Sequence, residues 1–399
     1  MSGADEARRA RSQASAPAPR PGLAVVLREW GRIGCIGFGG PPAHIALLRE
    51  LCVERRGWLD DREFEDAIAA TNLLPGPAST QLAIYCAWRL RGIAGALVGG
   101  AGFILPGLVL ILALAALFLA DSPPGWALGA GAGSGAAVAA VALQAAASLA
   151  PASRRRAAAR PRWLLYTLAG AVSAATVGAW LVLVLLGCGA LEIALRRIRS
   201  AGAGVAAIHA WPLLATAGAA SGGLLALAWL AFKVGALSYG GGFVIIPLMQ
   251  HDAVHTYDWM TGGQFLNAVA LGQVTPGPVV QTVAVVGYAA AGVGGGLLAA
   301  AVAFAPSFSF ILVGAERFDR LRANQSVRCF LDGAGPAAIG AIAGAAIPLA
   351  LALTETWQFA VLAAAVVALF VLRHGVVSTV IVAGAVGALA SALGAPLPG

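Results

Sequence analysis

The sequence predicts an all-α polytopic membrane protein with two homologous halves in inverted topology and with broken or re-entrant helices. Three observations predict this fold class: the apolar composition, an internal duplication, and a reversed distribution of basic residues between the two copies. Apolar residues make up 59% of the 399 residues, charged residues make up 11%, and mean hydropathy is +0.82. Soluble domains are about 45–50% apolar and about 25% charged. The composition therefore excludes a soluble enzyme, a disordered protein and a disulfide-rich scaffold.

The duplication is visible as matching motifs about 200 residues apart. Residues 33–40 read IGCIGFGG and residues 234–241 read VGALSYGG, an offset of 201. A Pro-Gly-Pro motif at residues 75–77 recurs at the same offset, and after a one-residue gap Pro106 matches Pro306. Internal duplication is a common construction of secondary transporters. The shared frame therefore predicts two equivalent halves.

The ends of the chain set the expected domain boundaries. The first 22 residues combine arginines with Ala, Ser and Pro, a composition typical of disordered segments. The apolar run that follows stops at Arg28, which is too short for the core of a signal peptide. We expect a disordered cytoplasmic tail over residues 1–22, a first repeat over residues 23–200 and a second repeat over residues 201–399.

Basic residues are distributed in opposite ways in the two copies. The connector at residues 49–62 carries four arginines, whereas the matching residues 250–263 carry neither Lys nor Arg. Later the pattern reverses, because residues 121–124 have no basic residue and the loop at residues 317–328 has four arginines. Cytoplasmic loops are enriched in Lys and Arg, so equivalent loops are expected on opposite sides of the membrane. A parallel repeat whose loop charges diverged independently is the alternative.

Two segments of each copy contain helix-breaking sequences. Residues 24–48 and 224–249 contain glycine runs, and residues 64–88 and 265–288 contain the Pro-Gly-Pro motifs. Prolines on both sides of a glycine remove two backbone donors and prevent a continuous helix. In a bilayer the freed backbone groups must be satisfied by protein or must line a water-filled cavity. Arginines at both ends of the 64–88 segment predict a re-entrant hairpin, with about four spans after it in each copy.

The breaks predict a binding site for an anion near the middle of the membrane. A half-helix that starts after a break offers unpaired N–H groups and the positive end of its dipole. Four such ends could converge on one oxyanion, and glycines allow the backbone to approach it closely. Polar or cationic side chains flank these breaks at matching positions in both copies. The candidate substrate-binding residues are Arg32, Gly39, Gly40, Asn72, Pro75, Gly76, Pro77, Gln81, Lys233, Gly240, Gly241, Gln273, Pro276, Gly277, Pro278 and Gln281.

Each of these features also has a purely structural explanation. Glycine-rich helix segments often allow helices to pack closely, and Arg32 and Lys233 could extend to the membrane surface without contacting a ligand. Transport driven by protons would require a titratable group. Glu65, Asp66 and His44 are the nearest to the breaks, and the sequence does not choose among them.

Signatures of catalysis are missing from the sequence. Lys233 is the single lysine and is not part of a phosphate-binding loop. The five cysteines contain no CxxC pair, which argues against a structural metal or a disulfide framework. We therefore expect no enzyme activity, no cofactor and no metal site. The net charge of +8 is assigned to cytoplasmic loops, so nucleic acid is not expected as a partner.

Four runs in the first half resemble the chromate ion transporter family. They are FGGPPAHIALL at residues 38–48, GWLDDREF at 57–64, LLPGPASTQLA at 73–83 and RGIAGALVGGAGFILPG at 91–107. In the second half, SYGGGFVIIPLM at 238–249 and VTPGPVVQT at 274–282 are similar to the second domain of that family. The resemblance covers roughly residues 25–395, and it fits a long-chain, two-domain member.

This resemblance implies a secondary transporter in the inner membrane. Such a protein would export chromate, would be driven by an ion gradient and would give chromate resistance. The residues themselves support an anion but not chromium, so a sulfate or other oxyanion permease is the alternative. A passive channel or a membrane-embedded enzyme is a third hypothesis. The expected partners are the oxyanion and membrane lipid, and motifs of small residues allow a homodimer.

Overall fold

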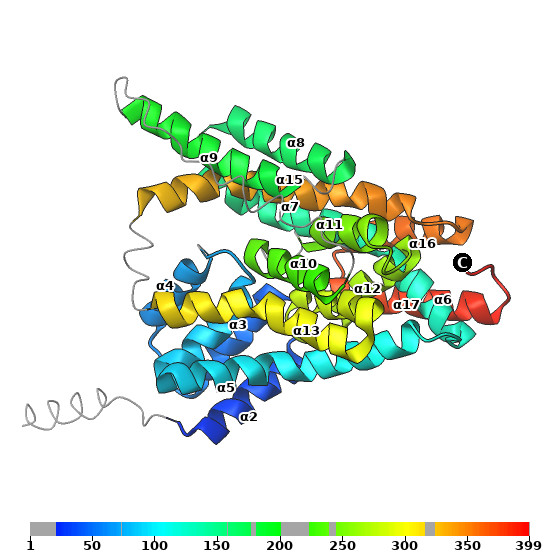
Figure 1. The fold of residues 1–399 in the computed structure, drawn as a ribbon, viewed down its shortest axis with the longest axis horizontal. Coiled ribbons are helices and arrows are strands. Elements are labelled where there is room, and N and C mark those ends of the chain that lie inside the picture. Colours follow the sequence, from blue (N-terminus) through cyan, green and yellow to red (C-terminus); the bar gives the residue numbers. More distant parts are fainter. Residues whose placement is uncertain are drawn as a thin grey trace, which may run out of the picture.

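A computed structural model describes residues 21–399, with the exception of residues 73, 158, 177–180, 201–222, 239–244, 316–323 and 399. All regular secondary structure in the described part is helical (Figure 1). Four of the described helical segments are long and apolar enough to cross a membrane: Ala78–Phe118, Gly125–Arg155, Val279–Gly314 and Gln325–Leu351. The expected all-α polytopic class is confirmed. The expected tail over residues 1–22 lies mostly outside the described residues, and the repeat boundary near residue 200 lies beside a range that is not described, so both remain predictions.

The two halves begin with the same series of elements. The series is a short helix, a second helix that ends in a π-helical turn, a third helix, and a long helix after the Pro-Gly-Pro motif. In the first half these are α2 (Leu23–Ile36), α3 (Pro41–Arg49), η1 (Glu50–Arg55), α4 (Asp61–Thr71) and α5 (Ala78–Phe118). In the second half they are α10 (Leu224–Leu237), α11 (Ile245–Gln250), η4 (His251–Thr256), α12 (Gly262–Val274), η5 (Val279–Gln281) and α13 (Thr282–Gly314).

The long helices α5 and α13 each consist of two legs. Gly92 has φ 59° and ψ −145°, and its counterpart Gly292 has φ 62° and ψ −155°. Glycine adopts this conformation without the steric cost that a side chain would add. After Gly92 the chain folds back, so that the second leg packs against the first. A Cβ at Gly95 on the second leg would lie 2.2 Å from the carbonyl oxygen of Ala87 on the first. Together with α4, the first leg forms the predicted re-entrant hairpin, and Arg89 near its end pairs with Glu63 at the start of α4.

The second legs of α5 and α13 run antiparallel to each other. A Cβ at Gly100 would lie 2.4 Å from Phe308, and a Cβ at Gly296 would lie 2.5 Å from Leu112. Moving forward along one leg therefore moves the contact backward along the other. Equivalent helices that are antiparallel are related by a two-fold axis perpendicular to them, which places the axis in the plane of the membrane. The inverted topology is confirmed, and a parallel repeat would have made these legs parallel.

The end-to-end arrangement of the bundle agrees with the distribution of charge. In Figure 1, α4, the end of α13 and the start of α15 lie at the left end of the molecule, and the connection from α5 to α6 lies at the right end. The first group borders the arginine-rich connectors of both halves, whereas residues 121–124 carry no basic residue. The positive-inside rule therefore predicts that the left end of Figure 1 faces the cytoplasm.

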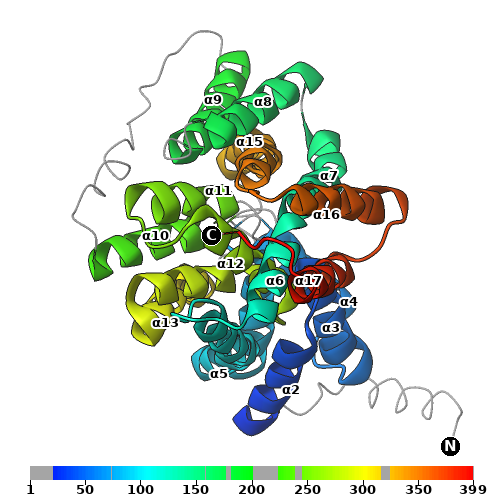
Figure 2. The same ribbon diagram turned by 90° about the vertical axis from the view of Figure 1, so that its right-hand side faces the viewer.

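The remaining helices complete the bundle. The first half continues with α6 (Gly125–Ala136), α7 (Val138–Arg156), α8 (Arg160–Thr176) and α9 (Leu181–Ser200). The second half continues with α15 (Gln325–Leu351), α16 (Thr356–Val366), η7 (Val367–Val371) and α17 (Val376–Ala392). Viewed end-on, α6 and α12 lie in the middle, with α2, α5 and α13 on one side and α8, α9 and α15 on the other (Figure 2).

Several glycines have the packing role that the sequence allowed. A Cβ at Gly340 would lie 1.8 Å from the carbonyl oxygen of Thr167, and a Cβ at Gly344 would lie 2.2 Å from that of Ala171. The helices α15 and α8 therefore touch backbone to backbone. Small residues at such positions are typical of helix contacts in membranes, where close van der Waals packing drives association.

Candidate functional site

The two Pro-Gly-Pro motifs interrupt the helices in the same way in both halves. Gly76 has φ 114° and Gly277 has φ 97°, both in the region that favours glycine. Helix resumes at Ala78 in the first half and at Val279 in the second. The N–H groups of Thr80 and Gln81 donate to the carbonyl oxygen of Pro77, which leaves the first N–H groups of α5 without a helical partner.

Each break packs against the proline-containing helix of the other half. A Cβ at Gly107, which follows Pro106, would lie 2.1 Å from the carbonyl oxygen of Pro276. The counterpart of Gly107 is Ser307, whose Oγ would lie 3.3 Å from a Cβ at Gly76. The N–H of Gly277 also donates to the carbonyl oxygen of Gly37 at 3.0 Å. The two breaks therefore interlock across the interface between the halves.

The glutamines that follow the breaks are buried and partly satisfied. The Nε2 of Gln81 donates to the carbonyl oxygen of Pro75 at 2.7 Å, and the Nε2 of Gln281 donates to that of Ile104 at 2.7 Å. The Oε1 atoms of both have no partner. An amide nitrogen carries two hydrogens, so each glutamine keeps one donor and its oxygen available for a ligand or a water molecule.

Unpartnered polar atoms are concentrated around the breaks. Buried polar side chains almost always have hydrogen-bond partners. In the described part of the chain, seven buried side-chain atoms have none, and all but Ser173 Oγ belong to the break motifs or to segments that contact them. These six atoms are Thr80 Oγ1, Gln81 Oε1, Ser238 Oγ, Gln273 Nε2, Gln281 Oε1 and Ser307 Oγ. Their concentration indicates that a polar ligand or ordered water belongs in this region.

The two breaks differ in exposure. Asn72 and Pro75 are exposed, and Asn72, Gly76 and Ala78 line a cavity of about 210 Å³ between α4, α7 and α15. A water molecule occupies about 30 Å³, so this cavity has room for a tetrahedral oxyanion with water around it. In the second half Gln273 and residues 276–278 are buried. The two breaks thus have similar backbone geometry but differ in exposure at equivalent positions.

The glycine motif of the first half offers fewer backbone donors for an anion than the sequence predicted. Gly39 and Gly40 have φ 96° and φ 73°, and a Cβ at Gly40 would lie 4.0 Å from Val279 at the second break. However, Pro41 and Pro42 occupy the first two positions of α3 and have no N–H groups to offer. The prediction that four helix ends converge on an anion is therefore wrong for α3. Gly240 and Gly241 lie outside the described residues.

The two cations that match in the repeat are not equivalent in the structure. Arg32 is exposed on α2, whereas Lys233 pairs with Asp252 in η4. The repeat counterpart of Asp252 is Leu51, so this pairing exists in the second half alone. This difference is visible in the sequence, because residue 252 is acidic whereas its counterpart in the first copy is apolar. Since the charge of Lys233 is already neutralised, backbone and amide donors are left as the main groups for an anion.

One titratable side chain at the centre was not chosen by sequence reasoning. His44 on α3 is completely buried, with its ring edge-on to Phe103 at a centroid distance of 5.0 Å. Its Nδ1 lies 3.1 Å from Ser79 Oγ and its Nε2 lies 2.9 Å from the carbonyl oxygen of Gly37. By contrast, Glu65 is exposed on α4. His44 thus contacts the helix that follows the first break, through Ser79, and it contacts Gly37, whose carbonyl oxygen also accepts from Gly277 at the second break.

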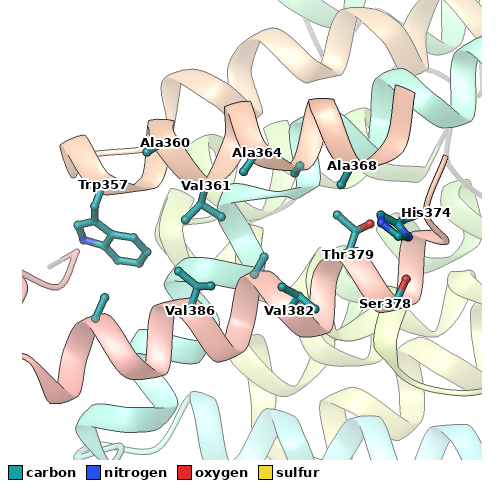
Figure 3. Close-up of a pocket in the computed structure, with 13 residues that line it drawn as sticks. Trp357, Ala360, Val361, Ala364, Ala368, His374, Ser378, Thr379, Val382 and Val386 are labelled. Atoms are coloured by element: carbon teal, nitrogen blue, oxygen red, sulfur yellow. The ribbon is translucent and has the colours of Figure 1, made fainter. Parts of the chain in front are cut away.

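A larger groove elsewhere has the wrong chemistry for an oxyanion. It has a volume of about 660 Å³ and lies between α16 and α17 (Figure 3). Its walls are alanine and valine side chains with Trp357 at one end, while His374, Ser378 and Thr379 are its polar residues. A dianion would lose its hydration there without gaining donors in return. The breaks, and not this groove, are the candidate anion site.

Comparison with known proteins points to the same kind of molecule. The family model described as "Chromate transporter" matches residues 24–193 and 225–389. A "Chromate transport protein" of Cupriavidus metallidurans is 32% identical over 383 residues, with 92% of each chain covered. A "Probable chromate transport protein" of Synechococcus elongatus is 30% identical over 344 residues, with 83% of this chain and 85% of that one covered. No solved structure matches.

Proposed function

Because the chain belongs to the chromate transporter family, we propose that it exports chromate across the cytoplasmic membrane by secondary transport and so gives chromate resistance. The observation that carries this proposal is the pair of interlocked breaks surrounded by unpartnered polar atoms. Inverted repeats with broken helices at matching positions are typical of secondary transporters, with the substrate site near the midplane.

The available groups suit a tetrahedral oxyanion. The first N–H groups of α5, at Ala78 and Ser79, stand at the positive end of the helix dipole. The Gln81 amide adds a donor on the same helix, and Gln281 adds one from the other half. A dianion held by donors from both halves would link their movements. This arrangement gives the residues around the breaks their proposed substrate-binding role.

The charge of chromate supports the proposed direction of transport. A dianion that leaves a cell with a negative interior moves down the electrical gradient, which contributes about 2.3 kcal/mol per charge per 100 mV. Export of chromate is therefore favoured by the membrane potential. The outer helices carry exposed apolar side chains such as Leu110, Val313 and Leu351, which suits contact with lipid.

Sulfate transport is the second candidate function. Sulfate has the same shape and charge as chromate, and backbone donors recognise both through the same interactions. Only the spacing of the donors could separate two ions that differ slightly in size. The proposal therefore requires a direct comparison of the two ions.

Everted membrane vesicles provide that comparison. Vesicles from cells that produce the protein are expected to accumulate labelled chromate when energised, and vesicles without the protein are the control. A tenfold excess of sulfate should leave most of this uptake in place. Uptake that sulfate abolishes would replace chromate with sulfate as the substrate, and uptake that ignores the proton gradient would indicate a channel.

A further inference from the structure

The hydrogen bonds of His44 define its protonation state in the structure. The carbonyl oxygen of Gly37 can only accept, so the Nε2 that lies 2.9 Å away must carry a hydrogen. In a neutral imidazole Nδ1 then has a lone pair, and the Ser79 hydroxyl at 3.1 Å must donate to it. The Ser79 hydrogen is therefore directed at His44 and not at the cavity side of the break.

No charged side chain on the described elements that pack against α3 reaches this ring. On α2, Glu29 binds Arg28 and Arg56, and Arg32 is exposed. In α3 and η1, Arg49 pairs with Glu54 and Asp61, and Arg55 pairs with Glu50. On α5, Arg89 pairs with Glu63, and Arg91 is exposed. A positive charge on His44 would thus be buried without a counter-charge, which is unfavourable unless a ligand supplies one.

We propose that His44 takes up one proton when the oxyanion binds and releases it when the oxyanion leaves, so that the two cross the membrane together. This inference rests on the proposed function and names its coupling group. Protonation places a hydrogen on Nδ1, which then donates to Ser79 Oγ. The Ser79 hydroxyl is released and can donate to an anion at the start of α5, while the imidazolium supplies the missing positive charge.

The position of His44 explains how one group could serve both halves. Its partner Gly37 also accepts from Gly277 N at the second break, and its other partner Ser79 follows the first break. The repeat counterpart of His44 is Ile245, so the second half has no equivalent group. Coupling by His44 alone therefore predicts one proton per anion. By linkage, the proton must favour anion binding by the same factor as the anion favours protonation.

Proteoliposomes that contain a trapped pH indicator test the coupling. A chromate gradient is imposed with no pH gradient and with the membrane potential clamped by potassium and valinomycin. The wild type is expected to move protons in the same direction as chromate, at about one proton per anion. His44→Gln, whose amide can still donate to the Gly37 oxygen, is expected to carry chromate with at least a tenfold lower ratio of protons to anions.

The matched control is His374→Gln, the same chemical change at an exposed histidine between η7 and α17. It should keep the wild-type ratio. If His44→Gln also keeps that ratio, the inference is wrong even though the proposed function stands. If wild-type liposomes carry no chromate, the proposed function fails, and the inference fails with it.

A binding measurement covers the case in which His44→Gln does not fold or does not transport. Titration calorimetry of the purified wild type in two buffers with different heats of ionisation counts the protons taken up per chromate bound. At about pH 8, above the ordinary imidazole pKa of about 6.5, chromate is already a dianion and His44 is neutral. Uptake of about one proton supports the inference, and binding without proton uptake overturns it.

Discussion

Replacing Glu192 with alanine is expected to lower the free energy of unfolding by about 3–5 kcal/mol, because it removes the carboxylate that Arg162 binds and one of the two that Arg196 binds. The Glu192 side chain is 3% exposed and accepts from Arg162 at 2.9 Å, from Arg196 at 2.9 Å and from the Tyr166 hydroxyl at 3.1 Å. Arg196 also binds Asp332 on α15 at 2.6 Å. This network therefore ties α8 and α9 of the first half to α15 of the second.

Thermal unfolding of the detergent-purified protein measures this effect. Glu192→Gln keeps the shape and part of the hydrogen bonding, so its melting temperature should fall between those of wild type and Glu192→Ala. Glu65→Ala is the matched control, because Glu65 is exposed on α4, and its melting temperature should stay within a degree or two of wild type. Equal melting temperatures for Glu192→Ala and Glu65→Ala would contradict the stabilising role of the network.

Replacing Gly107 with alanine is expected to abolish transport by forcing the two halves apart at the second break. The new methyl group would lie 2.1 Å from the Pro276 oxygen and 2.5 Å from Gln281 Oε1. The first of these atoms is backbone, which cannot move aside as a flexible side chain can. Overpacking of this kind typically costs about 1–3 kcal/mol in stability, and here it also displaces a proposed substrate-binding glutamine.

Gly294→Ala is the control for this prediction. Gly294 lies on α13, and a Cβ there meets nothing within 4 Å. Alanine is the better helix former by about 1 kcal/mol, so Gly294→Ala should be as active as wild type and at least as stable. Rates of chromate uptake in vesicles with matched protein levels make the comparison. Wild-type uptake by Gly107→Ala would show that the halves do not interlock as described.

The fold class could be predicted from the sequence because its signals are periodic and global. Composition indicates a membrane protein, and the 201-residue offset aligns α2 with α10 and η1 with η4 residue for residue. The reversed arginine content of equivalent loops predicted the inversion that the antiparallel legs of α5 and α13 confirm. Pro-Gly-Pro located the breaks, since prolines act on the local backbone alone.

The composition of the site could not be predicted in the same way, because it depends on contacts between the halves. Ser307 and Gly107 are distant in sequence from the breaks that they contact, and nothing local marks them. The burial of His44 and the pairing of Lys233 with Asp252 likewise arise from helix packing. The proline pair at the start of α3 was visible in the sequence, and its missing donors could have excluded that helix end.

The central claim is that the two breaks form one oxyanion site, and the glutamines after them test it most directly. Initial rates of labelled chromate uptake at low concentration are compared in everted vesicles for wild type, Gln81→Ala, Gln281→Ala and the double variant. A hydrogen bond to a charged group is worth about 1.5–3 kcal/mol, which corresponds to about a 10- to 150-fold loss per glutamine.

Gln325→Ala, at an exposed position at the start of α15, is the matched control and should transport like wild type. Immunoblots of the membranes confirm equal amounts of protein. The account predicts a large loss for each single variant and uptake near background for the double variant. Wild-type uptake by the double variant, at an equal protein level, would contradict it.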